Sequence, residues 1–199
     1  MTPGAVPFLG LTGGLGAGKS TALAALEALG AAVLSTDAVV HELYESDDIR
    51  DEVVARFGPE VAPGGVVDRS VLARHAFATP EDRAWLEGVL WPRVGARISS
   101  WREQQEVRVP PPVAAVIEVP LLFEAGMDAV FDTTLAVVSD EDVRAGRAAA
   151  RGHEAVDERS SRHFSQGEKA RRATYVVAND GSIDDLRAKL SDVLAKLSG

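Results

Sequence analysis

Short apolar runs and helix-spaced apolar positions alternate at the start of the chain. Residues 7–11 form an apolar run that leads into a glycine-rich stretch, which is typical of a buried strand followed by a glycine loop. From Ser20 leucines recur at helical spacing until Gly30, and a second apolar run covers residues 31–34. A strand, a helix and a strand in this order predict a βαβ unit, and therefore a parallel sheet with a right-handed crossover.

The pattern changes between residues 39 and 106, where apolar positions recur only at helical spacing. We expect one helix to end at Gly58, a second to follow Asp68 and a third to begin at Thr79-Pro80, where a capping residue, a proline and early acidic residues agree. Later runs predict strands at 113–119, 133–138 and 175–178 and helices at 140–152 and 183–197. The sequence thus predicts an α/β fold: a parallel sheet of about five strands flanked by helices, with a helical insertion after the second strand and a basic helical segment before the last.

Composition restricts the class of protein. The chain has 199 residues, of which 46% are hydrophobic and 26% charged, and its mean hydropathy is zero. These values are ordinary for a soluble globular protein. No apolar run reaches the ~20 residues of a membrane helix, and no basic segment precedes an apolar run at the start, so we expect a cytoplasmic protein without a membrane partner. The absence of cysteine excludes disulfides, thiolate metal sites and a cysteine nucleophile.

The charge is unevenly distributed. The net charge of −9 argues against a nucleic-acid partner, because a polyanion requires a basic surface. Between residues 144 and 172, however, eight basic residues face only four acidic ones. A basic island in an acidic chain indicates a local site for a small anion.

The most specific motif lies between the first expected strand and the first expected helix. Gly13 to Ser20 matches the pattern G-x-x-x-x-G-K-[ST], the phosphate-binding P-loop. Its glycines let successive backbone N–H groups turn toward phosphates, and the helix that follows adds its positive dipole end. Lys19 can reach the β- and γ-phosphates of ATP, and the Ser20 hydroxyl can ligate Mg²⁺. The structural alternative is a glycine turn with a surface lysine. We expect the following residues to bind ATP: Gly14, Leu15, Gly16, Ala17, Gly18, Lys19, Ser20 and Thr21.

The rest of the chain narrows the class of P-loop protein. The Asn-Lys-x-Asp motif by which GTPases read guanine is absent, and a motor or large ATPase would need a longer chain. The size, the helical insertion and the arginine-rich late segment favour a small-molecule kinase. A nucleoside, shikimate or gluconate kinase and a non-catalytic nucleotide-dependent switch remain alternatives at this point.

Further residues resemble one family of such kinases. They are Gly10 to Thr21, Asp37, Phe57-Gly58, Asp68-Arg69, Leu86-Glu87, Pro120 to Glu124 and Asn179-x-Gly181, in this order. With this set the chain resembles dephospho-CoA kinase from about residue 7 to residue 195, and the Pro120 to Glu124 element discriminates best because other small kinases lack it. The resemblance implies transfer of a phosphoryl group from ATP, with Mg²⁺, to the ribose 3′-hydroxyl of 3′-dephospho-CoA, which gives coenzyme A and ADP.

The resemblance and the element pattern together predict three parts. Residues 1–40, 113–143 and 173–199 are expected to form the nucleotide-binding core, and residues 41–112 the helical insertion that binds the acceptor. Residues 144–172 are expected to form a helical lid that closes over ATP and excludes water. The oligomeric state stays open between a monomer and a homotrimer.

Two positions carry the expected chemistry of transfer. Asp37 matches the family's catalytic aspartate and follows a parallel strand, where a carboxylate can accept the proton of the 3′-hydroxyl. The alternative is that Asp37 only caps the next helix. Arg147 matches a lid arginine of the family and shares a helix face with Arg151, so the two guanidinium groups can clamp the transferred phosphoryl group. A solvated basic face is the alternative here.

The acceptor side is less sharply defined. His41 lies one turn after Asp37 and resembles a family histidine, although a packed or solvated side chain fits the pattern equally. Glu118, near the end of a strand, is expected to contact the water shell of magnesium or the substrate. The resemblance implies that Leu121 and Glu124, in the Pro120 to Glu124 element, also bind the substrate. A structural salt bridge is the alternative for Glu118 and for Glu124. Residues of the helical insertion that could form a groove for the acceptor, or simply its core, are Phe57, Leu72 and Phe77.

Overall fold

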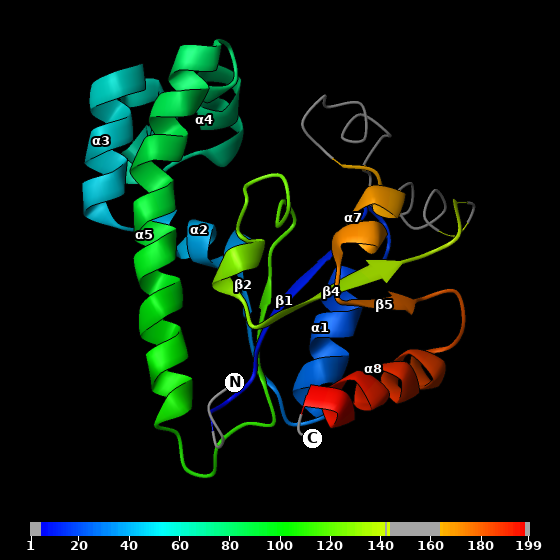
Figure 1. The fold of residues 1–199 in the computed structure, drawn as a ribbon. Helices are drawn as coiled ribbons and strands as arrows, with labels where there is room; N and C mark the ends of the chain where they lie inside the picture. The colour runs from blue at the N-terminus through cyan, green and yellow to red at the C-terminus, as the bar shows by residue number, and fades with distance from the viewer. Residues whose placement is uncertain (1–4, 142, 144–163, 198–199) are drawn as a thin grey trace. The chain divides into compact units, whose positions relative to one another are not determined.

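Five parallel strands form one sheet in the order β2-β3-β1-β4-β5 (Figure 1). The structure is a computed structural model that describes residues 5–141, 143 and 164–197. Every neighbouring pair of strands is parallel, so the predicted parallel sheet of five strands is confirmed. The strands are β1 (Phe8–Gly13), β2 (Ala32–Ser35), β3 (Ala115–Glu118), β4 (Thr133–Val138) and β5 (Tyr175–Ala178).

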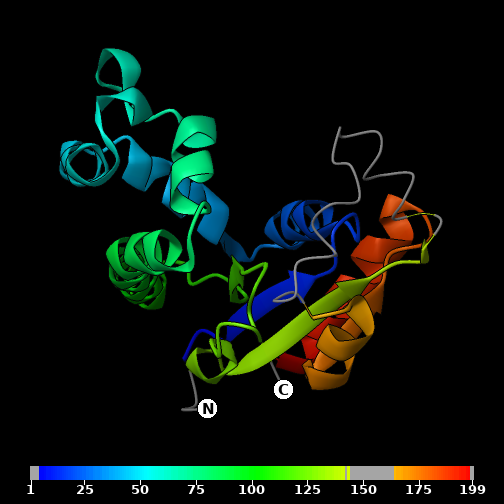
Figure 2. The ribbon, with the colours of Figure 1, turned by 90° about the horizontal axis from the view of Figure 1, so that it is seen from above.

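The two faces of β1 are covered by different parts of the chain. Alternate residues Leu9 and Leu11 enter a core with Leu26 of α1 (Lys19–Ala28) and Leu190 of α8 (Ile183–Leu197), and these two helices pack against each other (Figure 2). On the opposite face, Phe8 stacks on Phe131 with ring centroids 4.7 Å apart. Because both faces are buried, β1 and β3 are apolar throughout rather than alternating, apart from polar residues at their carboxyl ends.

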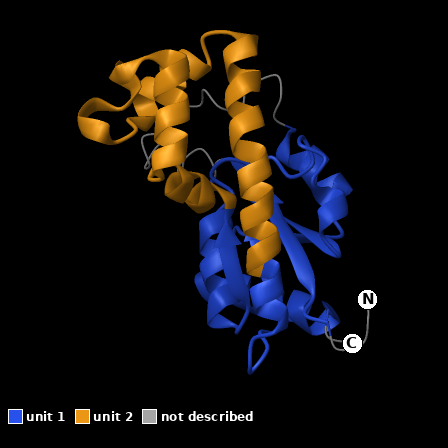
Figure 3. Ribbon diagram, turned by 90° about the vertical axis from the view of Figure 1, so that its left-hand side faces the viewer, with its two compact units in different colours: residues 1–35, 102–199 blue, residues 36–101 orange. Residues whose placement is uncertain are grey.

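The chain divides into two compact units, residues 1–35 with 102–199 and residues 36–101 (Figure 3). The second unit is helical: α2 (Thr36–Tyr44), α3 (Asp47–Phe57), α4 (Arg69–Ala76), the short 3₁₀ turns η1 (Pro59–Val61) and η2 (Pro63–Gly65), and most of α5 (Pro80–Glu106). Its own core includes Ile49, Val53, Val61, Leu72 and Leu86. The division between the units falls within α5, after Trp101.

Two further elements complete the described fold, and the sequence predictions can then be compared with it. The 3₁₀ turn η3 (Asp128–Val130) precedes β4, and α7 (Gln166–Arg172) packs against β1 and β4. The predicted ranges 133–138, 175–178 and 183–197 are confirmed as β4, β5 and α8. The strand predicted at 113–119 is shorter, at 115–118, and most of the helix predicted at 140–152 lies outside the described residues. Among the described helices, none is both long enough and apolar enough to span a membrane.

Candidate active site

The glycine motif forms a tight loop between β1 and α1. Gly16 and Gly18 have φ angles of 73° and 91°, in the left-handed region that side chains with a Cβ adopt only at a cost. At Gly13 a Cβ atom would lie 2.4 Å from the Val137 carbonyl oxygen, so only glycine allows β4 to approach this closely. The Ala17 N–H donates to the Gly14 carbonyl at 3.2 Å and closes the turn. The predicted strand–loop–helix context of the motif is therefore confirmed.

Asn179, the residue that follows β5, anchors the loop through a hydrogen bond. The Asn179 side chain, only 5% exposed, donates from Nδ2 to the Ala17 carbonyl at 2.9 Å. Next to it, Asp180 accepts hydrogen bonds from the Ser139 hydroxyl at 2.8 Å and from the Asp140 N–H at 2.7 Å. The ends of β4 and β5 are thus tied to each other and to the loop, which fixes the loop's backbone in advance of binding.

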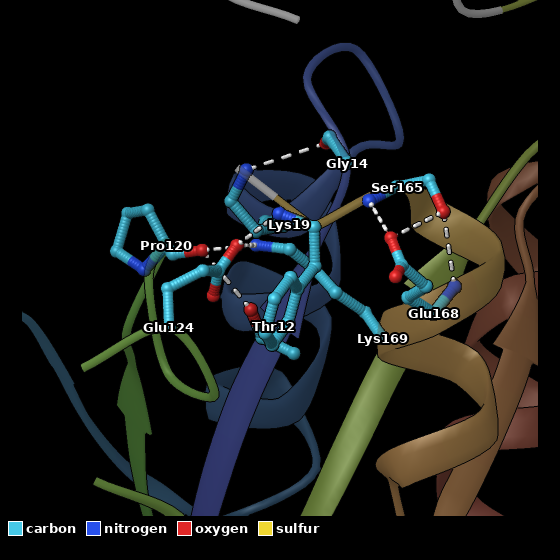
Figure 4. A network of polar contacts seen from close by, with 9 residues as sticks. Thr12, Gly14, Lys19, Pro120, Glu124, Ser165, Glu168 and Lys169 are labelled. Atoms are coloured by element: carbon cyan, nitrogen blue, oxygen red, sulfur yellow. Dashed lines mark hydrogen bonds and ion pairs between the residues drawn. The ribbon is translucent and has the colours of Figure 1, made fainter. Parts of the chain in front are cut away.

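The cationic and hydroxyl groups of the motif sit at the start of α1. Lys19 is partly exposed, and its Nζ donates to the Gly14 carbonyl at 3.4 Å, so the side chain folds back over the loop (Figure 4). Ser20 is exposed in the first turn of the same helix. A glycine cradle, a helix N-terminus, a lysine and a serine hydroxyl together fit the phosphates of a nucleotide with a bound divalent cation.

Glu118 lies at the carboxyl edge of the sheet, on the strand next to β1. It ends β3, is 7% exposed, and is in register with Leu11 of β1 and Ser35 of β2. Ligands of open parallel sheets bind at this edge. The carboxylate of Glu118 is consequently placed next to the strand that carries the P-loop, as its position after an apolar run predicted.

The Pro120 to Glu124 element is anchored by an unexpected lysine. The Lys169 Nζ lies 3.0 Å from Glu124 Oε1 and also donates to the Pro120 carbonyl, which accepts a second hydrogen bond from the Thr12 hydroxyl at 3.3 Å (Figure 4). Glu124 Oε1 accepts, in addition, the Phe164 N–H at 2.9 Å. Glu124 therefore makes the structural salt bridge that was the alternative to a substrate contact, whereas Leu121 remains half-buried.

The helical unit holds the remaining described candidates. Asp37 is exposed, and because α2 begins at Thr36, it lies in the first turn of the helix. The alternative in which Asp37 is the N-cap residue is not borne out, because Asp37 is the second residue of α2 and the N-cap position falls on Ser35. His41 follows one turn later and is 57% exposed in its side chain.

Three apolar candidates of this unit differ in exposure. Leu72 is 1% exposed and belongs to the unit's core, which was the alternative to a groove residue. Phe57 is half-buried and meets Trp85 edge to face at 5.3 Å between centroids, while Phe77 is 61% exposed. Arg147 and Arg151 lie outside the described residues.

Comparison with known proteins identifies the relatives of this chain. The family model for dephospho-CoA kinase matches residues 7–185. A dephospho-CoA kinase of Symbiobacterium thermophilum is 39% identical over 188 residues, which are 92% of this chain and 78% of the relative. One from Thermus thermophilus is 37% identical over 195 residues, 96% of this chain and 92% of the relative.

Solved structures show the same fold. The protein TT1252 from Thermus thermophilus superposes with a TM-score of 0.80 at 34% identity and covers 98% of this chain and 100% of its own. The dephospho-CoA kinase from Campylobacter jejuni superposes with a TM-score of 0.62 at 21% identity, covering 96% of this chain and 98% of its own. The resemblance inferred from the sequence is confirmed: this P-loop kinase belongs to the dephospho-CoA kinase family.

Proposed function

We propose that the chain phosphorylates the ribose 3′-hydroxyl of 3′-dephospho-CoA with ATP, giving coenzyme A and ADP in the last step of coenzyme A biosynthesis. Family membership over residues 7–185 carries the proposal, and the P-loop geometry supplies the site for the donor. The relatives named above carry this activity in their names, and they do not favour a nucleoside, shikimate or gluconate kinase or a non-catalytic switch. We further propose a cytoplasmic enzyme that acts on this small molecule and not on nucleic acid.

The donor site uses the P-loop. The backbone N–H groups of residues 14–18 and the N-terminus of α1 would bind the phosphates, and Lys19 would exchange its hydrogen bond with the Gly14 carbonyl for the β- and γ-phosphates. Mg²⁺, when bound with ATP, neutralises the phosphate charge. Its protein ligand would be the Ser20 hydroxyl, and Glu118, buried at the edge of the sheet, would hold a water of its shell.

The acceptor site begins at the end of β2. Asp37 is exposed in the first turn of α2, where its carboxylate can accept a proton or orient a hydroxyl group. General-base assistance of this kind contributes typically ~10²–10⁴-fold to a rate. When the transition state is loose, the carboxylate chiefly positions the 3′-oxygen for in-line attack, and the proton leaves late.

Two predictions from the sequence complete the proposal. Residues 41–112 would form the acceptor-binding part. Of the stretch 144–172 expected as the lid, residues 166–172 form α7, which packs against β1 and β4, so the closing part of the lid would be the residues before α7. Arg147 and Arg151 would neutralise charge on the transferred phosphoryl group. Such arginines contribute ~10³–10⁵-fold in related phosphoryl transfers. Exclusion of water matters here, because water would compete with the ribose hydroxyl for the phosphoryl group.

A direct assay tests the proposed function. The purified protein is incubated with Mg-ATP and dephospho-CoA, and mass spectrometry is used to look for coenzyme A. Adenosine, shikimate and gluconate serve as alternative acceptors in parallel reactions. Formation of coenzyme A at a far higher rate than any other phosphorylated product is the expected result. Preferred turnover of another acceptor, or nucleotide binding without turnover on any of them, would contradict the proposal.

A further inference from the structure

Arg69 differs from most arginines of the helical unit. Among the described residues, Arg50, Arg56, Arg83, Arg93 and Arg97 each pair with at least one carboxylate at 3.7 Å or less. Arg69 is exposed and is not within ion-pair distance of any described carboxylate. Its Nη1 lies instead 3.4 Å from Nδ1 of His41. An exposed guanidinium that contacts a histidine ring and no described carboxylate keeps its charge available to an external anion.

The position of Arg69 is fixed by the start of α4. The Asp68 side chain caps this helix by accepting the N–H groups of Ser70 at 2.9 Å and Val71 at 3.0 Å, so Arg69 is held as the first helical residue. Arg69 also lies near Tyr44 of α2: burial raises the pKa of the Tyr44 phenol, and the charge of Arg69 opposes part of that rise. Arg69 therefore extends from α4 toward α2.

The contact with Arg69 also places the two ring nitrogens of His41. Because a guanidinium can only donate, a hydrogen bond between the two side chains requires Nδ1 of His41 as the acceptor. The other ring nitrogen, Nε2, faces Glu45 Oε1 at 3.7 Å. The His41 ring thus contacts one N–H group of Arg69. The other N–H groups of the planar Arg69 guanidinium can bind two oxygens of a phosphate together.

We infer that Arg69, supported by His41, forms a subsite for the pyrophosphate group of the nucleotide acceptor. The inference rests on the proposed function, since 3′-dephospho-CoA carries a pyrophosphate on the 5′-oxygen of the ribose whose 3′-hydroxyl is phosphorylated. His41 lies four residues after Asp37, on the same face of α2 and about 6 Å along its axis. This separation is on the scale of one ribose ring. Asp37 would then contact the 3′-oxygen of the ribose, while Arg69 would bind the pyrophosphate on its 5′-oxygen.

The test compares substitutions at Arg69 with a matched control. Arg69→Gln removes the charge, Arg69→Lys keeps a point charge without the planar fork, and Arg74→Gln removes an exposed charge later on the same helix. Binding of dephospho-CoA is measured by calorimetry without ATP, and KM and kcat by the steady-state assay. We expect Arg69→Gln to raise the Kd and the KM for dephospho-CoA roughly 10- to 100-fold, Arg69→Lys to raise them less, and Arg74→Gln to leave them unchanged. The KM for ATP should stay the same in all three.

Adenosine, which lacks the pyrophosphate, is the acceptor in the second part of the test. Loss of Arg69 should not change kcat/KM for adenosine, because the group that Arg69 binds is absent. Equal losses with adenosine and dephospho-CoA, equal losses in the Arg69 and Arg74 variants, or an unchanged KM in Arg69→Gln would overturn the subsite.

The outcomes also separate the subsite from the proposed function. Normal production of coenzyme A with an unaffected KM in Arg69→Gln would reject the subsite alone. Arg69-dependent binding of dephospho-CoA without any transfer would reject the function alone. Failure of the wild-type chain to bind dephospho-CoA at all would reject both.

Discussion

Lys169 of α7 and Glu124 form an ion pair in the interior of the sheet-containing unit. The Nζ and Oε1 atoms are 3.0 Å apart, and the two side chains are 3% and 7% exposed. Removing two charges from water is costly, so such a pair persists only when further hydrogen bonds support it, as the Pro120 carbonyl and the Phe164 N–H do here. Glu124 Oε2, by contrast, is buried and has no hydrogen-bond partner among the described residues. The negative charge of Glu124 thus depends strongly on Lys169.

The first prediction concerns stability. Lys169→Met should lower the free energy of unfolding by about 3–5 kcal/mol, because it leaves a buried carboxylate without its counter-charge. The double variant Lys169→Met with Glu124→Gln should recover most of this loss, since neither side chain then carries a charge. Urea unfolding at neutral pH measures both effects.

An exposed pair supplies the control for this experiment. Asp51 is 70% exposed in its side chain and lies 2.8 Å from Arg50, so Asp51→Asn should change the free energy of unfolding by less than about 1 kcal/mol. A Lys169→Met protein as stable as the Asp51→Asn protein would show that the buried pair contributes nothing. A double variant no more stable than Lys169→Met would mean that packing, and not charge, explains the loss.

The ion pair of Lys169 and Glu124 could not be predicted from the sequence, whereas several elements of the fold could. Strands β4 and β5 and helix α8 could be predicted to the residue, because periodic apolar positions between polar stretches determine them locally. Lys169, however, is one of eight basic residues in a stretch typical of a solvated surface. Its burial is decided by Glu124, which is distant in the sequence. The Ser165 and Glu168 pair, a capping box, was a local signal that could have revealed α7.

The same distinction applies to the site. The P-loop could be predicted because all its residues are contiguous and its glycine conformations follow from the motif. Arg69 and His41, which contact each other, lie on two different helices. Asn179 and Ala17, which form a hydrogen bond, are far apart in the sequence. Neither contact follows from spacing along the chain.

The second prediction tests the P-loop lysine. Lys19→Ala should abolish phosphoryl transfer while leaving the circular dichroism spectrum unchanged, because Lys19 is partly exposed at the start of α1 and not part of the hydrophobic core. Lys196→Ala, an exposed lysine at the end of α8, is the control and should be fully active. Near-normal activity in Lys19→Ala, or global unfolding, would reject the assigned role.

The third prediction concerns the cap that holds Arg69 in place. The Ser70 hydroxyl, which donates to Asp68 Oδ1 at 2.6 Å, and the backbone N–H of Val71 lower the pKa of Asp68. A lowered folded-state pKa stabilises the fold above the unfolded pKa of roughly 4, and this contribution is lost as pH falls through the folded value. Asp68→Ala should therefore lower the melting temperature at pH 7.

The difference in melting temperature between the wild type and Asp68→Ala should shrink as the pH is lowered below about 4. Asp68→Asn is the matched variant, because asparagine caps a helix without a titrating group. Melting curves of the wild type and the two Asp68 variants, recorded from pH 3 to pH 7, measure how the difference in melting temperature depends on pH. A difference between wild type and Asp68→Ala that is the same at every pH would show that the charge of Asp68 makes no contribution.

The fourth prediction concerns two arginines outside the described residues. If Arg147 clamps the transferred phosphoryl group and Arg162 is solvated, Arg147→Ala should lower kcat more than tenfold and Arg162→Ala should change it little. Steady-state kinetics with saturating ATP separate the two variants. Equal losses at both positions would mean that the basic island acts as one diffuse field, and the assignment of a clamp would have to be withdrawn.

The last prediction addresses Asp37 and separates its chemical role from its place in a helix. Asp37→Asn keeps the size and polarity of the side chain at the start of α2 but removes its ability to accept a proton. If Asp37 is the base, the melting temperature and the KM for ATP should stay nearly unchanged while kcat falls by ~10²–10⁴-fold. If it mainly positions the hydroxyl in a loose transition state, the loss should lie at the low end of this range, and the KM for dephospho-CoA should rise. Asp47→Asn, an exposed acid in the first turn of α3, is the matched control and should leave the melting temperature, kcat and both KM values unchanged. An Asp37→Asn enzyme with normal kcat and KM would remove Asp37 from the mechanism, because a base that cannot take the proton cannot sustain the full rate.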